Sequence, residues 1–195
     1  MSHPEALVDA ALAGDEDAVR RLLAAGADPD GADDMGRTAV THAAYARHTT
    51  VLRLLVEAGA DIDLQDATRA NALLSTGETG FVDVLDEVLL AEPDLARTNR
   101  FGGTALIPAA DRGHVDVVRR LLATEIDVDH VNDLGWTALL EAVILGDGGL
   151  RHTEIVRLLV QAGADVSIAD REDVTPLTHA RAAGYDAIVA ILEAA

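Results

Sequence analysis

The residues best suited to chemistry in this sequence are three carboxylates and two arginines. Glu78, Asp111 and Glu141 supply carboxyl groups, while Arg100 and Arg112 supply guanidinium groups. Two carboxyl groups beside a cation can act as general acid and general base. An enzyme or small-ligand binder that uses these five residues is therefore one hypothesis, although solvated surface charges explain the neighbouring pair Asp111 and Arg112 more simply.

A recurring column of aspartates is the pattern most suggestive of a metal site. It consists of Asp28, Asp61, Asp94, Asp127 and Asp165. The terminal glutamate of a calcium-binding loop is missing, and aspartate favours turns because its side chain accepts hydrogen bonds from nearby backbone amides. The seven histidines include no His-x-x-x-His pair, which is the spacing of a helical zinc site. We therefore expect no metal and give the aspartates a structural role.

Nucleophiles and cofactor loops are also missing from the sequence. There is no cysteine, which excludes thiol nucleophiles, disulfides and cysteine-ligated metals. The nucleophile motif Gly-x-Ser-x-Gly is absent, and the glycines at 146–149 lack the lysine and hydroxyl residue of a phosphate-binding loop. We expect no catalytic residue and no cofactor.

The charge of the chain argues against two classes of partner. Acidic residues number 34 against 15 basic ones, all of them arginine, and the net charge is -19. Nucleic acids and anionic membranes both attract excess positive charge, so neither is an expected partner. No apolar run is long enough to span a bilayer, and the first five residues carry no basic signal region. These features predict a cytoplasmic protein.

The elements that must position these side chains belong to a repeat of 33 residues. Gly26-Ala27-Asp28 recurs as Gly59-Ala60-Asp61, and a second column advances in steps of 33, 33, 33 and 38. The members of that column are Thr38, Asn71, Thr104, Thr137 and Thr175. The longer step indicates a five-residue insertion near Gly146–Leu150, where the glycines predict a flexible turn.

Each repeat is predicted to form a helix, a tight turn, a second helix and a loop. Val117, Val118, Leu121 and Leu122 show the spacing of one buried helical stripe. Since a single repeat cannot bury its apolar face alone, we expect one domain, 1–195, in which neighbouring repeats stack. Glu193 occupies an otherwise apolar column, as a capping repeat requires. The six repeats span about 5–33, 34–66, 67–99, 100–132, 133–170 and 171–195.

The repeat resembles the ankyrin repeat over essentially the whole chain, about residues 5–195. The motifs that carry the resemblance are Thr175-Pro176-Leu177, Gly113-His114-Val115-Asp116-Val117-Val118 and the Gly-Ala-Asp loops. The stretch from Thr98 to Ala110 further resembles small stand-alone bacterial ankyrin proteins. The resemblance implies an all-α ankyrin-repeat solenoid of about six helix-turn-helix units. In such a fold hairpin-like finger loops project at one edge, inner helices line a concave face and outer helices form the back.

Two departures from the ankyrin pattern have structural consequences. No repeat has the usual histidine after Thr-Pro-Leu, so the hydrogen bonds that this histidine makes between repeats are in doubt. The usual glycine two residues before the threonine is Arg69 in the third repeat and Asp173 in the sixth. Because glycine is favoured at positive φ, we predict a distorted finger around Arg69.

The resemblance implies that a partner binds the fingers and the exposed side of the inner helices. Three of the five aromatic residues, Tyr45, Phe101 and Trp136, fall on those positions, whereas Phe81 and Tyr185 are expected to pack. Aromatic residues and arginine are enriched in interface hot spots, and an exposed apolar patch commonly marks an interaction site. The predicted partner-binding residues are Met35, Arg37, Tyr45, Arg100, Phe101, Arg112, Leu134, Trp136, Ile144 and Leu145.

The sequence thus favours a non-enzymatic protein–protein interaction module that binds its partner through the concave face and finger loops. The partner is a protein that the sequence does not identify. Phe101 and Trp136 have two alternative roles, packing between fingers and forming a homodimer contact. We expect a monomer, with a weak homodimer as the alternative.

Overall fold

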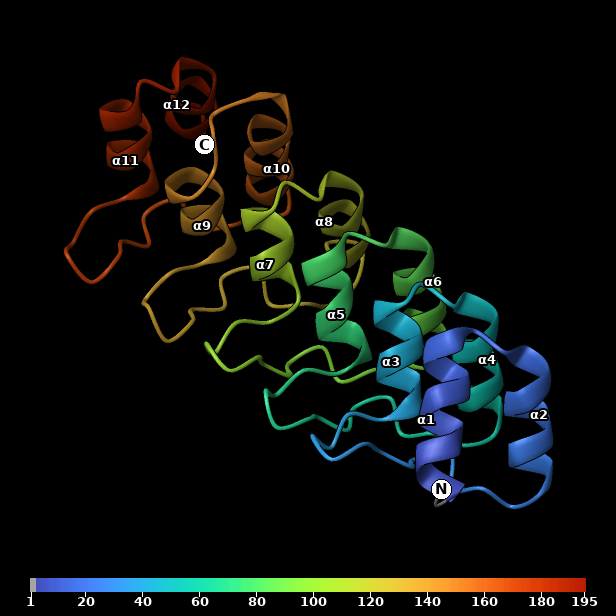
Figure 1. The fold of residues 1–195 in the computed structure, drawn as a ribbon. Helices are drawn as coiled ribbons and strands as arrows, with labels where there is room; N and C mark the ends of the chain where they lie inside the picture. Colours follow the sequence, from blue (N-terminus) through green and yellow to red (C-terminus); the bar gives the residue numbers. More distant parts are fainter. Residues whose placement is uncertain (1–2) are drawn as a thin grey trace. The chain divides into compact units, whose positions relative to one another are not determined.

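The computed structural model describes residues 3–195, with side chains from Glu5 onward. Within that range the chain forms twelve helices and no strand, so the predicted all-α class is confirmed (Figure 1). The helices are α1 (His3–Ala13), α2 (Glu16–Ala24), α3 (Ala39–Tyr45), α4 (Thr49–Glu57), α5 (Ala72–Thr79), α6 (Val82–Leu90), α7 (Leu106–Asp111), α8 (Val115–Leu121), α9 (Ala138–Ile144), α10 (Leu150–Gln161), α11 (Pro176–Ala183) and α12 (Asp186–Glu193). Among residues 3–195, no helix combines the length and the apolarity needed to cross a bilayer.

The chain divides into two compact units, residues 1–100 and 101–195. In the N-terminal unit the inner helices α1, α3 and α5 pack in sequence, and the outer helices α2, α4 and α6 form a second layer against them. The C-terminal unit repeats this arrangement, with α7, α9 and α11 inside and α8, α10 and α12 outside. Each unit therefore contains three helix pairs. The expectation that the whole chain is one domain stays a prediction.

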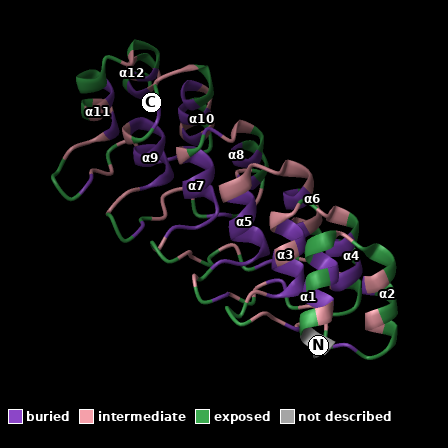
Figure 2. Cartoon of the chain, in the orientation of Figure 1, coloured by how far each residue is buried: buried purple, intermediate pink, exposed green. Residues whose placement is uncertain are grey.

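The core of each unit lies between its two helix layers, where Figure 2 shows the buried residues. The inner column Val40, Leu73, Leu106 and Leu139 is at most 1% exposed, and the outer column Leu55, Val88, Leu121 and Leu159 is fully buried. Burial of such side chains contributes about 1.5–3 kcal/mol each. In the last repeat Glu193 is exposed and pairs with Arg181 at 2.5 Å, as expected of a capping helix.

The threonine column marks where the inner helices begin. The side chains of Thr38, Asn71, Thr137 and Thr175 each accept a hydrogen bond from the backbone N–H three residues later. Such an N-cap satisfies one of the amides that a helix start leaves unpaired. Thr104 is the exception, because Ile107 N–H bonds its carbonyl instead and its hydroxyl has no partner among the described residues.

The aspartate column stabilises the loops, as predicted. Each of its five side chains accepts a hydrogen bond from the backbone N–H two residues later, at 2.8–3.1 Å. A second series of aspartates joins neighbouring loops: Asp30 accepts from Asp61 N–H at 2.7 Å, and Asp129 accepts from Asp165 N–H at 2.9 Å. The period of the column therefore reflects the stacking of the repeats.

The predicted distortion of the finger at Arg69 is wrong. Arg69 adopts φ 59° and Asp173 the same value, where the other fingers have glycine. The two hydrogen bonds that close this finger, Asp66 N–H to Ala70 O and Arg69 N–H to Asp66 O, match those of the finger at Asp33–Arg37. Hydrogen bonds from Thr68 and Ala70 to the Asp66 carboxylate hold the turn, so Arg69 takes the left-handed conformation without changing the loop.

The insertion after α9 forms a turn held by hydrogen bonds, and its predicted flexibility stays a prediction. The Asp147 carboxylate accepts from Gly149 N–H at 2.9 Å and lies 2.8 Å from Nδ1 of His152. The Tyr185 hydroxyl donates to the Gly146 carbonyl at 2.9 Å. A side chain at Gly148, which has φ 65°, would lie 2.3 Å from the Tyr185 ring. Gly148 is therefore required for close packing.

Candidate partner-binding site

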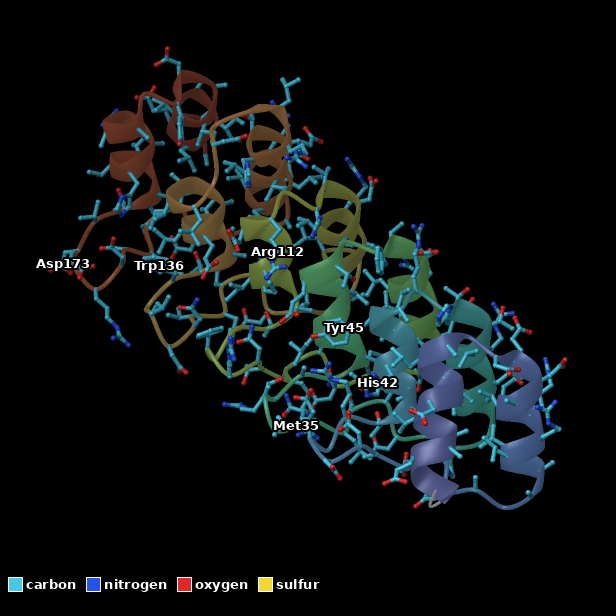
Figure 3. The ribbon with its side chains drawn as sticks, viewed as in Figure 1. Met35, His42, Tyr45, Arg112, Trp136 and Asp173 are labelled. Carbon is cyan, nitrogen blue, oxygen red and sulfur yellow. The ribbon has the colours of Figure 1, made fainter. Side chains whose placement is uncertain are left out.

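In the N-terminal unit, the predicted site residues belong to the finger before α3 and to α3 itself. Met35 lies at the tip of this finger and is 54% exposed, while Tyr45 ends α3 (Figure 3). The finger is joined to the next one by a hydrogen bond from Ala67 N–H to the Met35 carbonyl at 2.8 Å. The backbone at the tip is thus fixed, and the Met35 side chain is left facing solvent.

Arg37 and Tyr45 belong to one internal network. The Arg37 guanidinium bonds the buried Asp66 carboxylate at 2.6–2.8 Å and lies 4.9 Å from the centre of the Tyr45 ring. The Tyr45 hydroxyl donates to Glu78 at 2.8 Å. Burial, together with the Glu78 carboxylate, raises the pKa of Tyr45 well above its usual value. Tyr45 therefore remains a neutral hydrogen-bond donor, and the network offers its ring edge and the guanidinium as a preformed surface.

The C-terminal unit places its predicted residues on a surface that we call the C-terminal finger face. Its members are Phe101, Arg112, Leu134, Trp136, Ile144 and Leu145. Phe101, Leu134 and Leu145 are each about half exposed, at 53%, 49% and 49%, and Trp136 and Ile144 are partly buried. Arg112 is exposed at the end of α7, and Trp136 lies in the finger before α9 (Figure 3).

Backbone contacts hold the fingers of this face together. Asp133 N–H donates to the Phe101 carbonyl at 2.9 Å, and the Arg171 guanidinium donates to the Asp133 carbonyl. Since the Phe101 side chain keeps half of its surface exposed, the contact between these fingers does not bury the ring. Arg100 is exposed as well, but it is the last residue of the N-terminal unit.

A buried polar pair beneath the Trp136 finger was missed by the sequence analysis. Asn132 and Glu141 are 6% and 7% exposed, and Asn132 Nδ2 donates to Glu141 Oε1 at 2.8 Å. Asn132 Oδ1 accepts from the N–H groups of Leu134 and Trp136 at 2.9 and 3.0 Å. Burial, with the nearby Asp111 carboxylate, raises the pKa of Glu141 to about 7.

Two other fingers use a histidine at the position of Glu141. Nε2 of His42 lies 2.8 Å from the Asp33 carboxylate, and Nε2 of His179 lies 2.6 Å from that of Asp170. Each aspartate comes nine residues before its histidine, and Asn132 likewise comes nine residues before Glu141. The spacing of nine residues was the signal that could have identified these pairs. His42 and His179 each lie one residue after the position from which the usual ankyrin histidine is missing.

These fingers also lower the pKa of their aspartates. Burial opposes ionisation of Asp33, but hydrogen bonds from His42 and from backbone N–H groups hold its pKa below the usual value. At Asp170 the hydrogen bond from Val174 N–H lowers the pKa, with a further contribution from His179. Both carboxylates are therefore charged at neutral pH and hold their fingers closed.

The five residues considered for chemistry are divided between the two units. Glu78 and Arg100 belong to the N-terminal unit, and Asp111, Arg112 and Glu141 belong to the C-terminal unit. Glu78 accepts from Tyr45, and Glu141 accepts from Asn132. Within residues 3–195, no group of three or more His, Asp or Glu side chains is arranged to hold a metal ion. Glu78 and Glu141 thus have hydrogen-bond partners within their own units.

Stacked helix pairs with hairpin-like fingers define a helical repeat solenoid of the protein-binding kind. The family model for ankyrin repeats, in three copies, matches residues 2–66 and 72–170. The chain therefore belongs to the ankyrin repeat family. Ankyrin repeats are generally protein–protein interaction modules, and the family is generally non-enzymatic.

Solved structures and a curated relative agree with this assignment. An ankyrin repeat domain from Acinetobacter baumannii AYE is 44% identical, with a TM-score of 0.93 over 96% of both chains. The ankyrin repeat protein EF0377 is 38% identical, with a TM-score of 0.92 over 96% of both. The ankyrin repeat domain of Bcl-3, a member of the IkappaB family, is 27% identical, with a TM-score of 0.87 over 97% of this chain and 85% of that one. Ankyrin repeat protein YahD of Escherichia coli K12 is 42% identical over 55 residues, which are 28% of this chain and 27% of YahD.

Proposed function

We propose that this chain is a non-enzymatic binding module that captures a protein partner with its fingers and the exposed side of its inner helices. The observation that carries the proposal is the C-terminal finger face, where Phe101, Leu134 and Leu145 leave half of their apolar surface exposed. Exposing apolar area lowers solubility, so several exposed apolar side chains in neighbouring repeats are expected to have a function.

Rigidity of the finger face supports the same proposal. Backbone hydrogen bonds fix Phe101 against Asp133, and Asn132 holds Leu134 and Trp136 from below. A preorganised surface loses little conformational entropy on binding, so more of the contact energy appears as affinity. Trp136 and Arg112 are of the types most enriched in hot spots. Arg100 is of the same type, and Met35 adds exposed apolar surface to the N-terminal fingers.

The test is capture of the native partner by Trp136→Ala and Phe101→Ala variants. Each substitution removes an aromatic anchor, for which a loss of 2 kcal/mol or more is typical, or about thirtyfold in affinity. We expect both variants to keep the helical circular dichroism of the parent chain and to lose the proteins that it captures, as identified by mass spectrometry.

Leu150→Ala is the matched control. Leu150 is the most exposed large apolar residue, at 92%, and lies at the start of the outer helix α10. Its removal should leave capture unchanged. The proposal is wrong if Trp136→Ala and Phe101→Ala retain the same partners as the parent, or if Leu150→Ala loses them as well. Light scattering of the free protein separates a second copy of the chain from a different partner.

The alternative of an enzyme or small-ligand binder has less support. Both Glu78 and Glu141 are engaged by neighbouring side chains, Tyr45 and Asn132. The charge of -19 likewise opposes nucleic acid or an anionic membrane as the partner, because both bind excess positive charge.

A further inference from the structure

We propose that Glu141 is a positioning residue of the C-terminal finger face, which holds the Leu134–Trp136 finger through Asn132 and loosens it when its carboxylate takes up a proton. The partner-binding role of this face rests on the proposed function. The link from Glu141 to the finger rests only on hydrogen bonds and burial within the C-terminal unit.

The geometry makes Asn132 a relay. Its amide nitrogen donates to Glu141 at 2.8 Å, while its amide oxygen accepts from Leu134 and Trp136 N–H. An amide can satisfy these three contacts in one orientation only, because the nitrogen donates and the oxygen accepts. The Glu141 carboxylate therefore fixes the orientation of Asn132, and Asn132 fixes the backbone that carries Leu134 and Trp136.

Proton uptake by Glu141 changes the strength of this relay. A hydrogen bond to an ionised carboxylate is roughly twice as strong as one between neutral groups. Glu141 is almost fully buried, and desolvation together with the Asp111 carboxylate raises its pKa to about 7. The group thus changes charge in the physiological pH range, where an ordinary glutamate does not.

The helices α7, α10 and α11 pack against α9, which carries Glu141. On α7, Asp111 repels the carboxylate, and Arg112 follows it in the chain. His179 on α11 is paired with Asp170, and His152 on α10 contacts Asp147 and the Asp111 carbonyl. In the loop that leads to the finger, His130 Nε2 lies 2.7 Å from the Gly102 carbonyl. The histidines thus have partners of their own, and Asp111 is the charge that acts on Glu141.

Comparison with the fingers at Asp33 and Asp170 shows how the Asn132 finger differs. Asp33 and Asp170 accept the same finger N–H groups that Asn132 accepts, and each is paired with a histidine. In those fingers the group that accepts the backbone bonds is itself a carboxylate with a lowered pKa, so it stays charged at neutral pH. At Asn132, in contrast to these two fingers, the finger bonds depend on a second, titrating carboxyl group.

The test uses the single tryptophan of the chain, Trp136, as a reporter of its own finger. We expect the Trp136 emission of the full chain to change between about pH 5.5 and 8.5, with a midpoint near 7 that follows Glu141. In Glu141→Gln the side chain still accepts from Asn132 but carries no charge. Its emission should stay constant and equal that of the parent at low pH.

Two further variants separate Glu141 from other groups. Asp111→Asn removes the neighbouring charge, so the midpoint should move to lower pH. His130→Asn removes the histidine closest to the finger in the chain and should leave the midpoint unchanged. Circular dichroism over the same pH range checks that each variant stays folded.

The proposal is overturned if Glu141→Gln keeps the parent transition, if the transition disappears in His130→Asn, or if Asp111→Asn leaves the midpoint in place. The titration needs no partner. Its failure would leave the capture experiment with Trp136→Ala unaffected, and a negative capture experiment would leave the Glu141 titration intact.

Discussion

At the scale of single residues, Asn71 is the clearest defect in the N-terminal unit. It is fully buried and caps α5 through its Oδ1, but its Nδ2 has no hydrogen-bond partner among the described residues. Leaving a buried donor unsatisfied costs about 1–3 kcal/mol. Threonine occupies the same column at Thr38, Thr137 and Thr175 and provides the cap with a hydroxyl, which has one donor where the asparagine amide has two.

We therefore expect Asn71→Thr to increase the free energy of unfolding by about 1 kcal/mol, measured by urea denaturation. The reciprocal change, Thr137→Asn, introduces a donor at the buried N-cap of α9 and should decrease the free energy by a similar amount. An Asn71→Thr variant that is less stable than the parent would show that the amide has a packing role outweighing its missing hydrogen bond.

At the scale of elements, the glycine-rich insertion between α9 and α10 forms a turn that hydrogen bonds hold. Gly148 has φ 65°, and an added Cβ would meet the Tyr185 ring at 2.3 Å. Positive φ costs a residue with a side chain about 1–2 kcal/mol, and the ring must also move. Gly149 differs, because its φ is -75° and its closest neighbours are atoms of the exposed Asp147 side chain.

We expect Gly148→Ala to reduce the free energy of unfolding by about 2–3 kcal/mol and Gly149→Ala by less than about 1 kcal/mol. Tyr185→Phe combined with Gly148→Ala should not restore stability, since the clash involves ring carbons and not the hydroxyl. Equal effects of the two alanine substitutions in urea denaturation would mean that the turn is as flexible as its composition indicates.

At the scale of the whole molecule, the pH dependence of folding reflects two opposing sets of carboxyl groups in the C-terminal unit. Asp147, Asp165 and Asp170 have lowered pKa values in the folded state. Their contribution is present above the unfolded pKa near 3.8 and is lost as pH falls through the folded value. Glu141 acts in the opposite direction, because its folded pKa of about 7 lies above the usual glutamate pKa of 4.5.

The contribution of Glu141 is complete below pH 4.5 and is lost as pH rises through about 7, which corresponds to about 3 kcal/mol. We therefore expect the free energy of unfolding to be greatest near pH 5 and to fall towards pH 8. Denaturation of Glu141→Gln, compared with the parent at each pH, isolates this group. The free energy of unfolding of the variant should increase relative to that of the parent as pH rises. A constant difference between the two from pH 5 to pH 8 would contradict the assignment.

Much of the fold was predictable because it depends on local periodicity. The 33-residue columns identified the helix pairs, the buried apolar positions and the turn aspartates. Each of these follows from interactions within a few residues along the chain or from a repeated contact between neighbouring repeats. The error at Arg69 arose because the hydrogen bonds of the Asp66 carboxylate to its finger override the backbone preference of arginine.

The candidate site was predictable only in part. The repeat pattern placed Phe101 and Leu134 on fingers, and both are exposed. It did not predict the Arg37–Tyr45–Glu78 network or the pair Asn132–Glu141. These contacts join side chains from different turns or repeats, and their strength depends on burial that the sequence does not state.

By itself, then, the sequence determined the repeat, the all-helical class and the acidic, cysteine-free character of the chain, because composition and a fixed period are properties of the order of residues. Only the tertiary structure decided which side chains remain exposed and which carboxyl groups are buried together. That is because solvent exposure and the pKa of a group such as Glu141 are set by neighbours brought into contact through folding, and not by neighbours along the chain.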